Sequence, residues 1–457
     1  MGSYCEHSSL TNCLLTESNY FQKPSSFVKE TPFYMPNTIA PARWYRLIPL
    51  VFITYSLAYL DRANFGFAAA GGMNEDLHIS QAVSSLLSSL FFLGYFFFQI
   101  PGARYAAHKS AKKLIFVSLI LWAGLATATG MVSNLTALIA IRFLIGVVES
   151  AVMPSMLILL SQWFTKDERS RANTFLILGN PVTVLWMSVV SGYLINSLGW
   201  RWMFIIQGAP GILWAFVWWR MIAETPQEAD WLTVEEKAEL ERRLKEEQSS
   251  IKPVKNYSQA FRSAPVILLC IHYFLWSLGV YGFVMWLPSI IKASPEMDIV
   301  TTGWLSAVPY LLAIGGMVGA SYFADKSQKR TLFIWPFLLI ASSAFFGTYL
   351  MEGKDFWLSY GLLVLAGGAL YAPYGPFFAL ITELLPKNVA GGAIGLINSM
   401  GALGSFVGAY LVGYLNGLTG TFHASYILMA MAVLISALLT FVVANYFKRL
   451  RVNNGSR

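Results

Sequence analysis

The run LIPLVFITYSLAYLDRANFGFA (residues 47–68) decides the fold of this chain. A helix needs roughly 20 apolar residues to cross a hydrocarbon layer about 30 Å thick, and this run is long enough. It nevertheless carries Asp61 and Arg62 side by side near its end. A charged side chain at the centre of a membrane helix costs about 2.5 to 3.5 kcal/mol on insertion scales, so we expect this pair to have a function.

The rest of the chain shares this apolar character. Of its 457 residues, 56% are hydrophobic and 12% are charged, whereas about a quarter of the residues in soluble domains are charged. The apolar runs are continuous and do not alternate, which excludes a membrane barrel of strands. We therefore expect an all-α membrane protein with twelve transmembrane helices, at 46–70, 82–104, 113–131, 136–158, 172–196, 202–222, 265–291, 300–323, 331–350, 356–379, 390–416 and 424–447.

Basic residues are distributed unequally between the two sets of loops. One set is rich in Lys and Arg, as at Lys109 and Lys329, whereas the other holds Arg201, Lys292 and Lys354. Because loops rich in Lys and Arg remain in the cytoplasm, both termini are expected there. The net charge of +8 is then an insertion signal and does not indicate nucleic-acid binding.

Sequence signals of enzymes and metal proteins are missing. Cys5, Cys13 and Cys270 have no metal-ligand spacing and form no even disulfide framework, and the five His are scattered. No nucleophile with its base and no phosphate-binding loop is recognisable. We expect no catalysis and no cofactor.

A charged stretch, residues 224–250, separates two halves of six predicted helices each. Thr233 and Glu236 have capping-box spacing, and Glu241 with Lys245 forms a favourable pair, so a solvated connector helix is expected. The predicted parts are a disordered cytoplasmic tail 1–43, with Met35 as an alternative start, a first bundle 44–222, a connector 223–264, a second bundle 265–447 and a cytoplasmic tail 448–457.

Loops at corresponding places in the two halves have similar sequences. PGARYAAHKSAKK (101–113) follows the second predicted span, and SYFADKSQKR (321–330) follows the eighth. A small-residue helix end followed by a basic loop at corresponding places indicates an internal duplication.

With these loops the sequence resembles the major facilitator superfamily, whose pattern here is a Gly, an Asp-Arg or Asp-Lys pair and further basic residues. Asp325 and Lys326 match that pattern and would form a gating loop, whereas Ala107 and His108 depart from it in the first half. The resemblance implies two six-helix bundles that work by alternating access.

Two further charges lie within the fourth predicted span. Arg142 and Glu149, in IRFLIGVVESAVMPS, are seven residues apart and so share one helix face. Together with Asp61 and Arg62 they indicate a charged cavity along the bundle axis, where an Arg binds an anion through its planar fork and a carboxylate takes up protons. The alternative is that the four charges pair and hold helices together, a task that small residues and neutral hydrogen bonds usually perform.

The same residues resemble the anion:cation symporter branch of the superfamily, which moves sugar acids, aromatic acids and other organic anions. The resemblance runs from about residue 44 to 447. It is carried by Asp61-Arg62-x-Asn64, by YFFFQIPG (95–102), by the Arg142 to Glu149 spacing and by SQWFTKDERSRA (161–172).

The resemblance also implies roles for single residues. Arg62 would anchor the substrate carboxylate, Asp61 and Glu149 would couple protons, and Arg142 would be the partner of Glu149. Tyr95 would hydrogen-bond the substrate.

Further site residues follow from the second half and the fifth span. Asn398 takes the place of a polar ligand, with a packing hydrogen bond as its alternative. Asn180 stands where sugar-acid transporters of this branch have a Gln. Phe377 and Phe378 replace a Thr-Trp pair of a galactonate-type relative and would make the cavity floor more apolar.

The seventh predicted span supplies one more candidate. Tyr281 is expected to be a gate or a substrate contact, and Pro288 nearby predicts a bend or break of this helix.

These observations predict a monomeric importer of an organic anion, foremost a sugar acid, by proton symport in a bacterial inner membrane. An aromatic-carboxylate importer and an exporter of small organic molecules are the alternatives, and sodium coupling stays open. Exporters of the superfamily usually have a Gly-x-x-x-Gly-Pro-x-x-Gly-Gly pattern in the fifth span, which LILGNPVTVLWMS (176–188) lacks.

Overall fold

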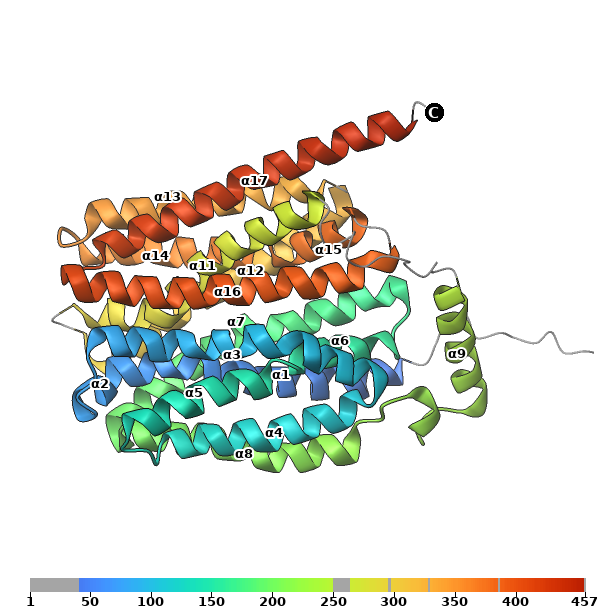
Figure 1. The fold of residues 1–457 in the computed structure, drawn as a ribbon, viewed down its shortest axis with the longest axis horizontal. Helices are drawn as coiled ribbons and strands as arrows, with labels where there is room; N and C mark the ends of the chain where they lie inside the picture. The colour runs from blue at the N-terminus through green and yellow to red at the C-terminus, as the bar shows by residue number, and fades with distance from the viewer. Residues whose placement is uncertain (1–40, 250–263, 295–296, 328, 385–386, 456–457) are drawn as a thin grey trace, which may run out of the picture. The chain divides into compact units, whose positions relative to one another are not determined.

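The computed structural model describes residues 41–249, 264–294, 297–327, 329–384 and 387–455, and within these ranges every regular element is a helix (Figure 1). The predicted tail 1–43 lies almost entirely outside them. The first half contains α1 (Ala42–Ala68), the π-helical η1 (Ala69–Met73), α2 (Asn74–Asp76), α3 (Gln81–His108), α4 (Ala111–Thr129), α5 (Leu135–Glu149), α6 (Val152–Ser161), α7 (Lys166–Leu198) and α8 (Trp200–Met221).

The connector and the second half follow. The connector holds the short 3-10 helix η2 (Pro226–Glu228) and α9 (Val234–Ser249). The second half contains α11 (Ala264–Lys292), α12 (Ile299–Ser327), η3 (Arg330–Phe333), α13 (Trp335–Met351), α14 (Phe356–Tyr371), α15 (Tyr374–Leu384), α16 (Lys387–Thr419) and α17 (His423–Gly455). Because α17 continues to Gly455, most of the predicted tail 448–457 is helical.

The twelve predicted runs each coincide with one helix or with two consecutive helices. In the described part of the chain, eleven helical segments are long and apolar enough to cross a membrane. The segment of α1 is not among them, although α1 has 27 residues, because polar and charged residues such as Asp61, Arg62 and Asn64 lower its hydropathy. These three side chains are buried inside the protein.

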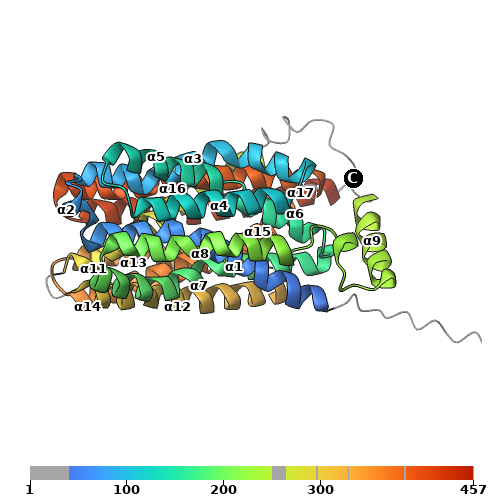
Figure 2. The ribbon, with the colours of Figure 1, turned by 90° about the horizontal axis from the view of Figure 1, so that it is seen from below.

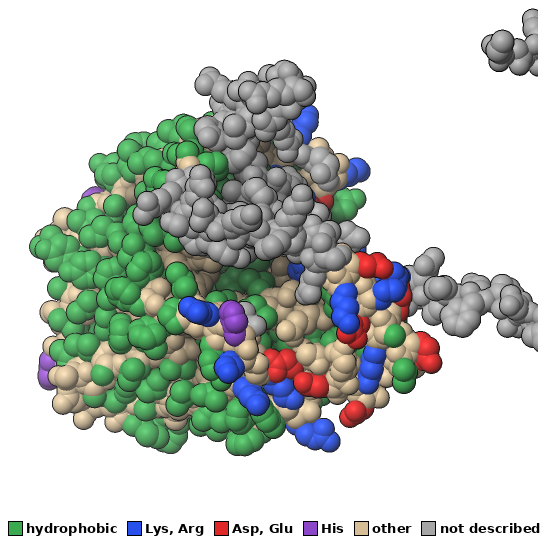
Figure 3. Space-filling view, turned by 45° about the vertical axis from the view of Figure 1, so that its right-hand side comes forward, with side chains coloured by type: hydrophobic (Ala, Val, Ile, Leu, Met, Phe, Trp, Pro, Cys, Tyr) green, Lys and Arg blue, Asp and Glu red, His purple; other side chains and the backbone are tan. Residues whose placement is uncertain are grey.

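The long helices of the described unit run side by side, and two views at right angles agree on this (Figures 1 and 2). Helix α2 lies at one end of them and α9 at the other, and we call these the α2 end and the α9 end. Charged side chains gather toward the α9 end, while hydrophobic side chains cover the flank of the helices (Figure 3). This distribution suits a protein whose flank faces lipid.

Two predicted spans are interrupted, at corresponding places in the two halves. The fourth is split into α5 and α6 after Glu149, and the tenth into α14 and α15 after Tyr371. Pro154 and Pro373 follow these points, and a proline removes a backbone hydrogen bond of the preceding helical turn. The apolar composition continues through both interruptions, which is why the sequence pattern indicated unbroken spans.

The expected break near Pro288 is absent. Helix α11 continues through this proline to Lys292. Pro288 lies near the end of the helix, where few residues follow it, so the helix tolerates the lost backbone hydrogen bond there.

The predicted connector helix is confirmed, including its cap. Glu236 accepts a hydrogen bond from the Thr233 N–H at 2.9 Å, and Thr233 Oγ1 accepts one from the Glu236 N–H at 3.2 Å. Lys245 and Glu241 form an ion pair at 2.5 Å. The connector is also docked on the first half, since Trp231 stacks on Trp163 with ring centroids 5.3 Å apart.

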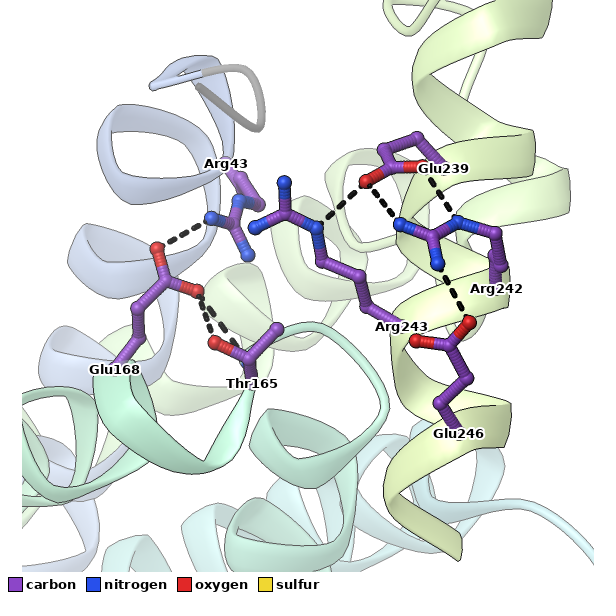
Figure 4. A network of polar contacts seen from close by, with 7 residues as sticks. All are labelled: Arg43, Thr165, Glu168, Glu239, Arg242, Arg243 and Glu246. Carbon is purple, nitrogen blue, oxygen red and sulfur yellow. Dashed lines mark hydrogen bonds and ion pairs between the residues drawn. The ribbon is translucent and has the colours of Figure 1, made fainter. Parts of the chain in front are cut away.

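An ion pair between a buried Arg and a partly exposed Glu joins α1 to α7 at the α9 end (Figure 4). Arg43 donates to the Trp163 carbonyl oxygen at 2.7 Å and pairs with Glu168 at 2.5 Å. Burial raises the pKa of the Glu168 carboxyl, but the hydrogen bonds from Arg43 and Thr165 and the Arg43 charge outweigh burial and hold this pKa below its ordinary value. The pair therefore stabilises the fold while Glu168 is ionised.

The halves approach each other closely between α7 and α12. A Cβ atom added to Gly192 would lie 2.8 Å from the Ile299 carbonyl oxygen, and one added to Gly303 would lie 2.6 Å from the Ser188 carbonyl oxygen. The two backbones touch here because neither glycine has a side chain. We call this contact the glycine seam.

We expect Gly303→Ala to destabilise the protein by about 1 to 3 kcal/mol, because its methyl group would overlap a backbone oxygen and force the helices apart. Gly315→Ala on the same helix is the matched control, since nothing lies within 4 Å of the added Cβ atom and alanine favours a helix more than glycine does. Thermal unfolding of the purified variants measures both. Equal melting temperatures would show that the seam is not closely packed.

A second prediction concerns pH. Folding lowers the pKa of Glu168. The ion pair therefore stabilises the protein fully at pH values above the ordinary carboxyl pKa, and this stabilisation is lost as the pH falls through the lowered pKa. Glu168→Gln keeps a hydrogen-bond acceptor but removes the charge of this partly exposed pair, so it should cost about 1 kcal/mol or less at pH 7, and this difference from the wild type should shrink as the pH falls below about 4.5. Melting temperatures across this pH range test it, and a difference that is independent of pH would contradict it.

Candidate functional site

A partly open cavity lies between the two halves, with about 530 Å³ of empty space when the open solvent at its mouth is included. Side chains from both halves line it, and the six residues for which the sequence predicted substrate contacts are all among them: Arg62 of α1, Tyr95 of α3, Asn180 of α7, Tyr281 of α11, Phe378 of α15 and Asn398 of α16. The structure thus brings together residues that are more than 300 positions apart in the sequence.

Arg62 is the one charged residue among the described side chains that line the cavity. Its Nε donates to Glu149 Oε2 at 3.0 Å, and the exposed fractions of the two side chains are 5% and 0%. The guanidinium also lies 4.8 Å from the ring centroid of Tyr95, a cation–π contact. Its Nη2 is buried and has no hydrogen-bond partner among the described residues, so it can donate to an anion in the cavity.

Arg142 does not pair with Glu149, contrary to what the family resemblance implied. It donates instead to the backbone oxygens of Leu87 and Asp61, each at 3.3 Å, and lies 4.4 Å above the Phe65 ring. Seven residues of helix rise by about 10.5 Å, so residues on one helix face can still be too far apart to touch. Arg142 therefore braces α3 and α1 against α5.

Asp61 lies behind the cavity wall and is 3% exposed. Its Oδ1 accepts a hydrogen bond from Asn64 at 3.5 Å. Together, Asp61 and Glu149 place two carboxyl groups beside two guanidinium groups inside the first half, a compact set of buried titratable and charged groups.

Much of the cavity lining is aromatic. Phe378 packs on Tyr374 with ring centroids 6.4 Å apart, and Tyr281 packs on Phe92 of the first half at 4.6 Å. Phe377, which the sequence placed on the cavity floor beside Phe378, is fully buried behind it.

Two amides line the cavity with different surroundings. Asn180 is 8% exposed, and its Oδ1 has no hydrogen-bond partner among the described residues, so it can accept a hydrogen bond from a ligand. Asn398 Nδ2 lies 3.9 Å from the sulfur of Met153, a contact between the halves. The packing alternative for Asn398 therefore has direct support.

Several lining residues were missed by sequence reasoning, among them Tyr55, Met153, Tyr273, Tyr374 and Ser405. Tyr55 could have been found, because it lies seven residues before Arg62 on the same face of α1. Met153 and Tyr374 face the cavity just after the two helix interruptions, which no sequence pattern indicated.

The predicted gating-loop residues lie away from the cavity. Asp325 and Lys326 are in the last turn of α12, and Asp325 pairs with Arg330 at 2.5 Å. Among the described residues, no group of three His, Cys, Asp or Glu is arranged to hold a metal ion.

Known proteins resemble this chain over most of its length. A putative tartrate transporter of Agrobacterium vitis is 30% identical over 407 residues, which cover 88% of this chain and 90% of that protein. A quinolone resistance transporter of Acinetobacter baumannii is 29% identical, with 87% and 93% covered. A D-galactonate transporter of Escherichia coli O6:H1 is 24% identical, with 82% and 89% covered.

The fold also resembles a solved structure, the xylose transporter of E. coli in an inward open conformation. Its TM-score is 0.68 at 12% identity, with 86% of this chain and 96% of that chain covered, which shows a common fold alone. The sequence profile of the Major Facilitator Superfamily matches residues 51–409 and 297–456. With two helical halves around a central cavity, this chain belongs to the Major Facilitator Superfamily and is a multi-pass membrane transporter, not an enzyme.

Proposed function

We propose that this protein imports an organic anion, foremost a sugar acid, by proton symport across a bacterial inner membrane. One observation carries the proposal, namely that Arg62 borders the cavity with its Nη2 unpartnered while its Nε is bound to Glu149. The proposal includes twelve membrane crossings, both termini in the cytoplasm and a monomeric protein. It also assigns gating to Asp325 and Lys326.

Proton coupling follows from the shared guanidinium. While Glu149 is ionised, it competes with a substrate carboxylate for the charge of Arg62. Protonation of Glu149 removes this competitor, so a bound proton and a bound anion each favour the other. Such mutual stabilisation is what a symporter requires. Asp61, the second buried carboxyl of this set, is the other proton-coupling residue in the proposal.

Substrate class is supported by the cavity and by the relatives. Asn180 Oδ1 offers an acceptor to a hydroxyl group, and Ser277 and Ser405 add hydroxyls to the lining. Relatives named as tartrate and D-galactonate transporters handle hydroxylated acids. This set favours a sugar acid.

Two other candidates have specific observations in their favour. The aromatic wall around Phe378 and Tyr374 would suit an aromatic carboxylate. The relative named as a quinolone resistance transporter favours export of a small organic molecule.

We expect Arg62→Ala to lower the affinity for the anion at least about 30-fold, because removal of one partner of a buried charge pair costs about 2 kcal/mol or more. Binding of labelled galactonate, rhamnonate, galacturonate and 4-hydroxyphenylacetate to the purified protein measures this. Arg201→Ala is the control, because Arg201 pairs with Asp76 far from the cavity. If Arg62→Ala binds the same acid as tightly as the wild type, Arg62 is not the anchor.

Uptake into proteoliposomes tests the coupling. An inward proton gradient should drive accumulation of one of these acids by the wild type, whereas Asp61→Asn and Glu149→Gln should keep exchange of labelled for unlabelled substrate and lose accumulation, since exchange moves no net proton. Accumulation driven by a sodium gradient would show that sodium, and not the proton, is the coupling ion. Outward transport only would favour the exporter.

A further inference from the structure

A chain of hydrogen bonds leads from Asp61 into the first half, away from the cavity. Asn64 Nδ2 donates both to Asp61 Oδ1 at 3.5 Å and to Gln207 Oε1 at 3.3 Å. Gln207 Nε2 then donates to Ser191 Oγ at 2.8 Å. The chain thus connects α1, α8 and α7.

All four residues of this amide chain are buried, with exposed fractions of 3% for Asp61 and 7% or less for the others, and none of them lines the cavity. Buried amides cost free energy unless they are hydrogen-bonded, so two amides in series inside a membrane protein call for a reason. Asn64 Oδ1 is buried and has no hydrogen-bond partner among the described residues, so the chain keeps one vacant acceptor.

This vacant acceptor matters because the chain begins at a carboxyl group. An ionised Asp61 can only accept hydrogen bonds, and the observed direction, from Asn64 Nδ2 to Asp61 Oδ1, matches that state. A protonated Asp61 has an O–H to donate, and Asn64 can accept it by turning its amide so that Oδ1 replaces Nδ2. Gln207 then has to turn as well, its Nε2 donating to Asn64 Oδ1 and its Oε1 accepting from the Ser191 hydroxyl. Every hydrogen bond of the chain is kept and each is reversed.

The chain ends beside the contact between the two halves. Ser191 precedes Gly192, which touches the Ile299 backbone of α12 across the glycine seam. When the chain has its observed direction, the Ser191 hydroxyl accepts from Gln207 and is free to donate elsewhere. In the reversed direction the Ser191 hydroxyl donates its hydrogen to Gln207 Oε1. The protonation state of Asp61 therefore changes the bonding of a residue next to the seam.

We propose that Asn64 and Gln207 are positioning residues for the proton-coupling step, which transmit the protonation state of Asp61 to α7 at the glycine seam by reversal of the amide chain. This inference rests on the proposed function, because it takes Asp61 as a proton-coupling group. The charged groups that act on Asp61 are Arg62 on its own helix and Arg142 and Glu149 on α5. None of these belongs to the amide chain, so the chain can be altered while they stay in place.

The test measures the pH profile of substrate exchange in proteoliposomes. Gln207→Met keeps the length of the side chain but breaks the amide chain. It also removes the support that holds the Asn64 amide toward the ionised Asp61 carboxyl. The hydrogen bond from Asn64 favours the ionised form of Asp61. Its weakening should therefore move the midpoint of the exchange pH profile to higher pH. A net hydrogen bond of about 0.5 to 1.5 kcal/mol corresponds to a shift of up to about one pH unit.

Ser191→Ala is the second variant and should shift the midpoint in the same direction by less, because it removes the last link alone. Ser188→Ala is the matched control, since Ser188 is buried one turn away on α7 and donates to its own helix at Val184. If Gln207→Met fails to fold, Ser191→Ala against Ser188→Ala decides. A structural role would lower the melting temperature and leave the midpoint unchanged.

The outcomes separate the inference from the proposed function. A midpoint shift in Gln207→Met and Ser191→Ala, with none in Ser188→Ala, supports the amide chain. If the wild type accumulates substrate under a proton gradient but the amide-chain variants keep the wild-type midpoint of the pH profile, only the inference about the amide chain is overturned. A wild type without such accumulation, or one whose accumulation survives Asp61→Asn, overturns the role of Asp61 in coupling and the chain with it.

Discussion

The ion pair between Arg62 and Glu149 is the interaction on which the site depends. Both charges lie inside a protein whose flank faces lipid, where an unpaired charge is far more costly than in water, so each holds the other in place. Because the pair uses only Nε of the guanidinium, Nη2 keeps no hydrogen-bond partner among the described residues. The same contact thus fixes α1 against α5 and prepares a binding group for an anion.

The two halves contribute differently to the cavity. The first half supplies the charge, through Arg62, and holds both buried carboxyl groups. The second half supplies aromatic rings and small polar groups from α11, α15 and α16. The Tyr59 and Tyr371 hydroxyls meet at 3.1 Å across the halves. In the part of the chain that the structure describes, the cavity therefore takes its charge from the first half alone.

The connector belongs with the first half. Trp231 stacks on Trp163, Arg46 lies 5.6 Å above the Trp231 ring, and Arg169 pairs with Glu247 at 3.4 Å. The loop after α6 and the start of α7, where the Arg43–Glu168 pair lies, are therefore covered by α9. Helix α9 is thus held to the first half by the Arg169–Glu247 pair.

The sequence by itself determined the all-helical class, the capped connector helix and the six substrate-contact candidates that the cavity brings together. The helices and the buried charges follow from local patterns, since hydropathy sets helix length and the cost of buried charge singles out Arg62 and Glu149. The substrate-contact candidates Tyr95, Asn180 and Asn398 came instead from the family resemblance. Only the tertiary structure decided which groups touch: Arg62 with Glu149, Arg142 with backbone oxygens, and Asn64 with Gln207. It also showed the paired helix interruptions. Such choices depend on distances between helices far apart in the sequence, and no periodicity along one helix encodes them.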